Sequence, residues 1–191
     1  MQNTKVKKLV SIAMMSAIAY IVMFFAFPIM PAFGFLKADL SDLVVLIGTF
    51  IYGPTGGIAI AFVRSLLHFL TSGGNLPSLI GDTASFIAST VFLLPMYYVL
   101  RKHSNAGRQA LASILATIVL ALVMGFLNLV IITPLYMQLL GMSVGMPLIK
   151  YVLIAVVPFN LIKGALISAV FSVVYVRMMP WVKAQAASFK H

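Results

Sequence analysis

Long apolar stretches alternate with short polar breaks along the chain, and this pattern predicts six helices. The apolar stretches cover residues 9–27, 40–53, 56–72, 79–100, 110–133 and 151–179. About 20 apolar residues are enough to cross the hydrocarbon core of a bilayer as a helix. We therefore expect an all-α membrane protein in which six transmembrane helices form one bundle and a single domain over residues 1–191.

The polar breaks differ in length, and this predicts how the helices are connected. The second and third apolar stretches are separated by a Gly-Pro-Thr-Gly-Gly sequence at residues 53–57. Such a sequence is typical of a tight turn, so these two stretches should form a helical hairpin. Longer breaks predict loops at residues 28–38, 72–78 and 134–150.

Composition strengthens the membrane assignment. The chain is 62% hydrophobic and 8% charged, whereas soluble domains are about 45–50% apolar and about 25% charged. Little of the chain is therefore left over for a soluble domain. Because there is no cysteine, disulfides and thiolate chemistry are excluded.

The net charge of +10 is better explained by membrane orientation than by a nucleic-acid partner. If the N-terminus is cytoplasmic, nine basic residues face the cytoplasm and only Lys37 and Lys150 face outward. Such an excess is usual for cytoplasmic loops. We expect cytoplasmic N- and C-termini, a multi-pass cell-membrane protein surrounded by the lipid bilayer, and no nucleic acid. The nine residues are Lys5, Lys7, Lys8, Arg101, Lys102, Arg108, Arg177, Lys183 and Lys190.

Polar residues inside the predicted spans are concentrated toward the outer side. A charge at the bilayer centre costs roughly 2.5–3.5 kcal/mol on insertion scales, so each one needs a partner, a cavity or an interface. Only Arg64 falls near mid-depth. The others come from five helices, and their position toward the outer side predicts a cavity that opens outward and captures an external solute. They are Asp39, Asp42, His68, Asp82, Asn128, Asn160 and Lys163.

Two asparagines and one lysine offer the chemistry to bind a planar heterocycle. Asn160 and Lys163 are three residues apart and share a helix face. An asparagine amide offers both donors and an acceptor, and the lysine adds a cation. Pockets also need apolar walls, for which the candidates are Phe33, Phe35, Phe62, Phe69 and Tyr151.

Structural roles are alternatives for several of these residues. An intramembrane asparagine can simply join two helices, at about 0.6 kcal/mol. Lys163 could form an ion pair with Asp42 or Asp82. Arg64 is better explained as the partner of an aspartate, or as a snorkelling side chain, than as a ligand contact. His68 either packs or lines the site. Asp39 and Asp42, which open the second helix, could have no role other than capping its N-terminus.

Enzyme and ATPase motifs do not account for this chain. Residues 141–145 read Gly-Met-Ser-Val-Gly, but that pattern works only in a strand-to-helix elbow with an acid and a histidine in reach. There is no phosphate-binding loop and no cluster of metal ligands. We therefore expect no catalytic residue, metal or cofactor, and the energy for active transport would come from a partner. A channel or transporter that works alone remains an alternative.

In five segments the chain resembles the substrate-binding S components of energy-coupling-factor (ECF) vitamin transporters, especially the riboflavin-specific members. The segments are FLKADLSDL at 35–43, IYGPTGG at 51–57, RSLLHFL at 64–70, GDTASFI at 81–87 and PFNLIKG at 158–164. Ser85 departs from the family pattern, which would have asparagine there. Together the segments extend over most of the chain.

The resemblance implies a six-helix S component that binds riboflavin from outside as its substrate. Asn128, Asn160 and Lys163 would bond the polar edge of the flavin ring, and the first loop would close over the site as a lid. By residue chemistry alone, thiamine, biotin or a folate would fit nearly as well, although the positive charge of thiamine suits Lys163 poorly. The other candidate substrate contacts are Leu36, Ala38, Asp42, His68 and Asp82.

The resemblance also implies partners. An S component works with a transmembrane coupling protein and two cytoplasmic ATPase subunits, in a bacterial plasma membrane. Ala13 and Ala17 lie one helical turn apart on the first helix, and small residues at this spacing allow close helix contact. The resemblance implies that these two alanines meet the coupling protein.

Overall fold

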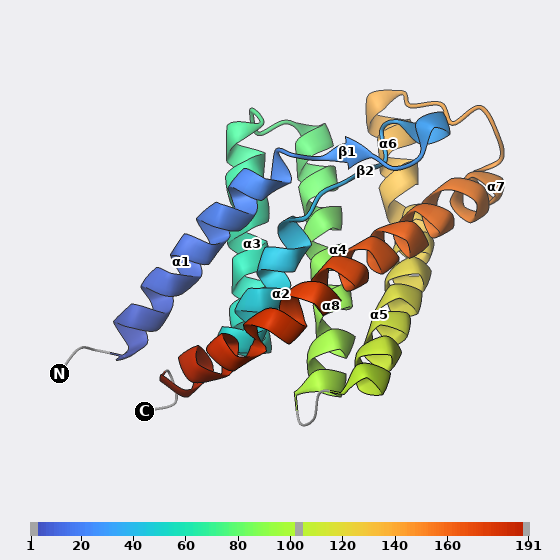
Figure 1. The fold of residues 1–191 in the computed structure, drawn as a ribbon. Helices are drawn as coiled ribbons and strands as arrows, with labels where there is room; N and C mark the ends of the chain where they lie inside the picture. Colours follow the sequence, from blue (N-terminus) through green and yellow to red (C-terminus); the bar gives the residue numbers. More distant parts are fainter. Residues whose placement is uncertain (1–3, 102–104, 189–191) are drawn as a thin grey trace.

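The computed structural model describes residues 4–101 and 105–188, and nearly all of these residues are helical (Figure 1). The α-helices are α1 (Thr4–Met23), α2 (Ser41–Tyr52), α3 (Pro54–Thr71), α4 (Leu76–Leu100), α5 (Ala106–Leu127), α6 (Thr133–Leu140), α7 (Leu148–Tyr151) and α8 (Val157–Ser188). Two π-helical turns, η2 (Asn128–Ile132) and η3 (Val152–Val156), join α5 to α6 and α7 to α8.

Because the π turns make continuous helices of α5–α6 and α7–α8, the described chain follows six helical paths, as predicted. Four of these paths are long and apolar enough to cross a membrane: Lys5–Met23, Leu76–Leu100, Ala106–Leu140 and Leu148–Tyr175. Helix α2 is apolar but shorter. It forms the predicted hairpin with α3, and the turn at Gly53 has φ of 84°, which glycine adopts readily.

The fifth helix is longer than the sequence indicated. It was predicted to end at 133, before Pro134, but it continues through α6 to Leu140, so most of the predicted loop at 134–150 is helical. A proline has no N–H and its ring clashes with the carbonyl four residues earlier. The π turn removes this conflict: the Thr133 N–H bonds to the Asn128 carbonyl, five residues back. A π turn likewise precedes Pro158, because η3 ends at Val156.

The first loop contains a small sheet that an all-α prediction omits. Strands β1 (Phe27–Pro28) and β2 (Lys37–Ala38) pair antiparallel, with Phe27 opposite Ala38. A short 3-10 helix, η1 (Pro31–Phe33), forms the bend between them. Helix α1 therefore ends at Met23 rather than at 27, and the loop is a structured strap over one end of the bundle (Figure 1).

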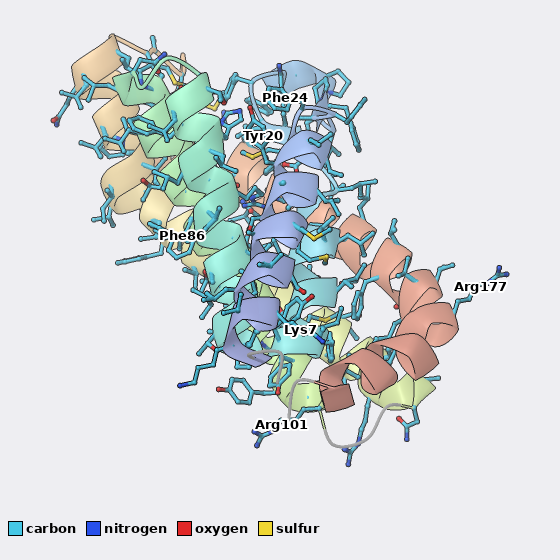
Figure 2. All side chains as sticks on the ribbon, turned by 90° about the vertical axis from the view of Figure 1, so that its left-hand side faces the viewer. Lys7, Tyr20, Phe24, Phe86, Arg101 and Arg177 are labelled. Atoms are coloured by element: carbon cyan, nitrogen blue, oxygen red, sulfur yellow. The ribbon has the colours of Figure 1, made fainter. Side chains whose placement is uncertain are left out.

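The two ends of the bundle differ in character. The start of α1, the end of α4, the start of α5 and the end of α8 lie at one end, whereas the β1–β2 strap and the α6–α7 connection lie at the other (Figure 1). Lys7 and Arg101 lie toward the end that carries the termini, whereas Arg177 projects sideways from α8 (Figure 2). Of the nine basic residues predicted to be cytoplasmic, Lys102 and Lys190 lie outside the described residues.

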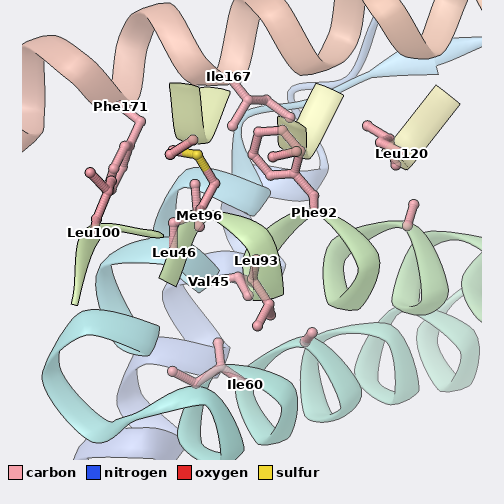
Figure 3. Packing of buried hydrophobic residues seen from close by; sticks show 14 of the residues in the cluster. Val45, Leu46, Ile60, Phe92, Leu93, Met96, Leu100, Leu120, Ile167 and Phe171 are labelled. Atoms are coloured by element: carbon pink, nitrogen blue, oxygen red, sulfur yellow. The ribbon is translucent and has the colours of Figure 1, made fainter. Parts of the chain in front are cut away.

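The hydrophobic core fills the half of the bundle nearer the termini. Phe92, Leu93 and Met96 of α4 pack there against residues of α2, α3, α5 and α8 (Figure 3). Helices α5 and α8 approach closely, because a Cβ atom at Gly164 would lie only 3.1 Å from the backbone Cα of Thr117. This contact sets the position of α8, which carries two of the predicted site residues.

Candidate solute-binding site

A cavity of about 820 Å³ lies at the end of the bundle that carries the β1–β2 strap. Along α4, the residues that line this cavity fall between Pro77 and Ala88, whereas most of the buried core residues of α4 fall between Phe92 and Leu100. The remaining walls come from the end of α1 and the strap that follows it, from α3, α5, η2 and α6, and from the α6–α7 connection, α7, η3 and α8. Small-molecule pockets are typically about 300–1,000 Å³, so the cavity suits a vitamin-sized solute.

The structure gathers most of the predicted substrate contacts around this one cavity. The predicted residues that line it are Leu36, His68, Asp82, Asn128, Asn160 and Lys163. Asp42 and Ala38 do not line it, contrary to expectation. Ala38 is fully buried in β2 of the strap.

Both asparagine amides are oriented by their own helices. The Asn128 Nδ2 donates to the Met124 carbonyl at 2.9 Å, and its Oδ1 accepts from the Thr133 hydroxyl at 3.1 Å. The Asn160 Nδ2 donates to the Val156 carbonyl at 2.8 Å. Since an amide carries two N–H donors and an oxygen with two lone pairs, each side chain keeps a donor and an acceptor for a solute.

Lys163 lines the cavity and is held from behind by an aspartate. Its Nζ lies 3.0 Å from Oδ2 of Asp42, whose Oδ1 lies 2.9 Å from the Arg64 guanidinium. The alternative of an ion pair between Lys163 and Asp42 is therefore confirmed, and an ion pair with Asp82 is not present. Asp42 lies away from the cavity wall because cations from α3 and α8 share its carboxylate.

Arg64 is the centre of this buried network. Its side chain has no exposed surface, and its two terminal nitrogens donate to the hydroxyls of Ser41, Ser85 and Ser89 at 2.7, 3.0 and 2.9 Å. Arg64 is thus an aspartate partner, as expected. Ser85 stands where the family pattern has asparagine, and here it bonds the guanidinium and also lines the cavity. The Asp39 Oδ1 accepts from the Ser41 N–H at 2.7 Å just before α2, and Asp39 also lines the cavity.

A second cluster of polar side chains on the cavity wall comes from α3, α4 and α6. His68 Nδ1 lies 2.8 Å from Asp82 Oδ1, whereas the buried Oδ2 of Asp82 has no hydrogen-bond partner among the described residues. Tyr136, whose hydroxyl donates to the Pro77 carbonyl at 3.0 Å, also lines the cavity. The sequence analysis missed Tyr136 because Pro134 placed it in a predicted loop.

The aromatic walls are only partly those expected. Phe35 and Tyr151 line the cavity with ring centroids 6.2 Å apart, but Phe62 packs against Phe86 at 5.8 Å instead. Neither Phe33 nor Phe69 reaches the wall. The sequence analysis did not single out the aromatic wall residues Phe24, Tyr136 and Phe159.

The face of α1 that carries Ala13 and Ala17 is exposed, whereas Ser16 and Ala19 of the same helix are buried against the bundle. Phe24, just beyond the end of α1, lines the cavity. One side of α1 is therefore available to another protein or to lipid, while the chain that follows it borders the site.

Helices that are apolar enough to cross a membrane, with a cavity near one end that carries several polar side chains, are typical of a membrane protein that binds a small solute. The chain belongs to the family described as ECF transporter, substrate-specific component, whose model matches residues 7–175. The resemblance inferred from the five sequence segments is thereby confirmed. Members of this family are transporter components and not enzymes.

Curated relatives and a solved structure agree with this assignment. The chain is 35% identical over 189 residues to the riboflavin transporter FmnP of Bacillus subtilis, covering 98% of this chain and 100% of the relative. It is 36% identical over 174 residues to the riboflavin transporter RibU of Streptococcus thermophilus, covering 90% and 82%. A solved S component of a bacterial ECF transporter is 37% identical, with a TM-score of 0.76 over 94% of this chain and 99% of that chain.

Proposed function

We propose that this chain is the riboflavin-binding S component of an ECF importer. It captures the vitamin outside the cell and delivers it to the cytoplasm together with a coupling protein and two ATPase subunits. The observation that carries the proposal is the presence of Asn128, Asn160 and Lys163 on the wall of one cavity. The names of the relatives support riboflavin over other vitamins.

The chemistry of riboflavin matches the wall. One edge of its ring alternates carbonyl oxygens with an N–H, which suits the two amides and the ammonium. The opposite edge carries methyl groups and suits the aromatic walls. The ring also bears a chain of hydroxyl groups, whose O–H donors would satisfy the unpartnered Oδ2 of Asp82 beside His68.

In the proposed orientation all six helices lie in the membrane as a single domain over residues 1–191, with both termini in the cytoplasm. The basic side chains at the end that carries the termini support this orientation (Figure 2). The cavity then lies in the outer half of a bacterial cell membrane. Residues 28–38 form its lid, from which Leu36 and Lys37 reach the cavity.

The proposed contact with the coupling protein is the exposed face of α1 around Ala13 and Ala17. Small side chains there let a partner helix approach closely. Loading of the cavity and docking of the partner would thus involve the same part of the chain, because α1 leads directly to Phe24.

Binding of riboflavin by the purified protein tests the proposed function. The protein is purified in detergent, stripped of bound flavin, and titrated with riboflavin while the quenching of flavin fluorescence is followed. We expect saturable binding to one site that excess thiamine or biotin does not displace. In liposomes without ATPase subunits, the protein should bind riboflavin but not accumulate it. A folded protein that does not bind riboflavin would contradict the proposal.

A further inference from the structure

We propose that Asp42 is a positioning residue, which holds the Lys163 ammonium at the cavity wall and does not itself touch the solute. In turn, Arg64 and Ser89 hold Asp42 in place. This inference rests on the proposed function, since its readout is the affinity for riboflavin. It assigns Asp42 a different role from the direct contact that the sequence suggested.

The Asp42 carboxylate is turned away from the solute and toward its own network. Its Oδ2 faces Lys163 at 3.0 Å, and its Oδ1 accepts from Arg64 at 2.9 Å and from the Ser89 hydroxyl. The residue is 3% exposed and absent from the cavity wall, whereas Lys163 is on that wall. Asp42 therefore reaches a bound solute only through the ammonium of Lys163.

Lys163 needs a counter-ion such as Asp42 in order to bind a solute from its buried position. A lysine ammonium is a compact charge on a flexible four-carbon stem, and it is 94% buried here, with 6% of its surface exposed. A buried cation without a counter-ion is strongly disfavoured. Asp42 compensates the charge and uses one of the three N–H donors, so two donors remain for acceptors of the solute.

The network behind Asp42 is rigid because three helices contribute to it. Arg64 on α3 is fully buried and bonds Ser41 on α2 and Ser89 on α4. Its planar guanidinium fixes the directions of these donors. Ser89 adds a second constraint, since its hydroxyl contacts both Asp42 and the Ser85 carbonyl. The carboxylate is thus held before a solute arrives.

A double-mutant cycle separates positioning from direct contact. The dissociation constant for riboflavin is measured for the unmodified protein, Asp42→Asn, Lys163→Met and the double variant. We expect Asp42→Asn to weaken binding about tenfold or more when Lys163 is present, because a charge-assisted hydrogen bond is lost. In the Lys163→Met background the same change should alter affinity by less than about twofold, since no partner remains to be positioned.

Two outcomes overturn the proposal. If Asp42→Asn weakens binding equally in both backgrounds, Asp42 contacts the solute or acts only through general stability. If it leaves the affinity unchanged when Lys163 is present, Lys163 does not depend on it. Loss of riboflavin binding by the unmodified protein would instead contradict the proposed function, so the two failures can be told apart.

Ser89→Ala provides a milder test if Asp42→Asn does not fold. This change removes one hydrogen bond to Asp42 and keeps every charge. Affinity should fall about two- to tenfold, and only when Lys163 is present. Ser172→Ala is the matched control: the Ser172 hydroxyl also donates to the carbonyl four residues earlier, at 2.8 Å, but within the described residues it forms no hydrogen bond to the network. Equal effects of the two serine variants would refute the positioning role.

Discussion

Replacing Gly164 with alanine tests whether the close packing of α8 on α5 keeps the site in place. A Cβ atom at this position would lie 2.8 Å from the Oγ1 of Thr117, 2.9 Å from its Cγ2 and 3.1 Å from its Cα. The threonine side chain is stiff because it is β-branched, and its Cα cannot move alone. The two helices must therefore separate slightly.

The size of the effect follows from two opposing terms. Overpacking a well-packed interior costs typically about 1–3 kcal/mol, whereas the better helix propensity of alanine returns about 1 kcal/mol. The net loss is up to about 2 kcal/mol, which for a chain of this length lowers the thermal midpoint by about 4–8 °C. Because Lys163 is the preceding residue, we also expect riboflavin affinity to fall about fivefold, equivalent to about 1 kcal/mol.

The assay compares thermal midpoints by circular dichroism and riboflavin affinity by fluorescence quenching. Gly107→Ala is the matched control, because a Cβ there would lie 3.7 Å from its nearest neighbour, an ordinary contact. Adding Thr117→Ala to Gly164→Ala should restore only part of the loss, since the contact with the backbone Cα remains. If Gly164→Ala behaves like Gly107→Ala, the packing argument is wrong.

Two further predictions concern the proposed topology and partner. Since the chain has no cysteine, Ser143→Cys provides a single reporter in the α6–α7 connection; a membrane-impermeant maleimide should label it in intact cells, and labelling only after permeabilisation would reverse the proposed orientation. Tryptophans at Ala13 and Ala17 should abolish uptake but leave riboflavin binding intact, because they block close helix contact. Tryptophans at the exposed Ala165 and Ala169 of α8 are the control with the same spacing, and equal loss of uptake there would argue against a specific interface on α1.

Hydrophobic patterning predicted the helices well, because a segment in lipid must satisfy its backbone hydrogen bonds internally and a helix does so locally. It was wrong at Pro134, where proline was expected to end the helix. The π turn that accommodates Pro134 begins more than one helical turn earlier, at Asn128. No residue type in the sequence indicates such a turn. The same error hid Tyr136, which the sequence placed in a loop.

The polar residues of the site were predictable for a different reason. A charged or amide group is costly in an apolar span, so its presence alone marks Asn160 and Lys163 as candidates. The partner of each group was not predictable, because it depends on how helices distant in sequence pack. Asp42 could equally have faced the cavity; the pairing with Arg64 and Lys163 across three helices appears only in the fold.

The π turn η3 determines which way the last helix presents its polar side chains. Such a turn amounts to one extra residue within an α-helix, placed here between Tyr151 and Asn160. If the same residues formed a regular α-helix, all that follows the turn would rotate by about 100° relative to what precedes it. Asn160 and Lys163 would then turn away from the wall that Tyr151 forms. Deleting one residue of the turn that does not line the cavity, such as Leu153, would instead let the helix become regular while these two side chains still face that wall. The site should therefore tolerate a last helix that is one residue shorter better than a regular helix of the same length.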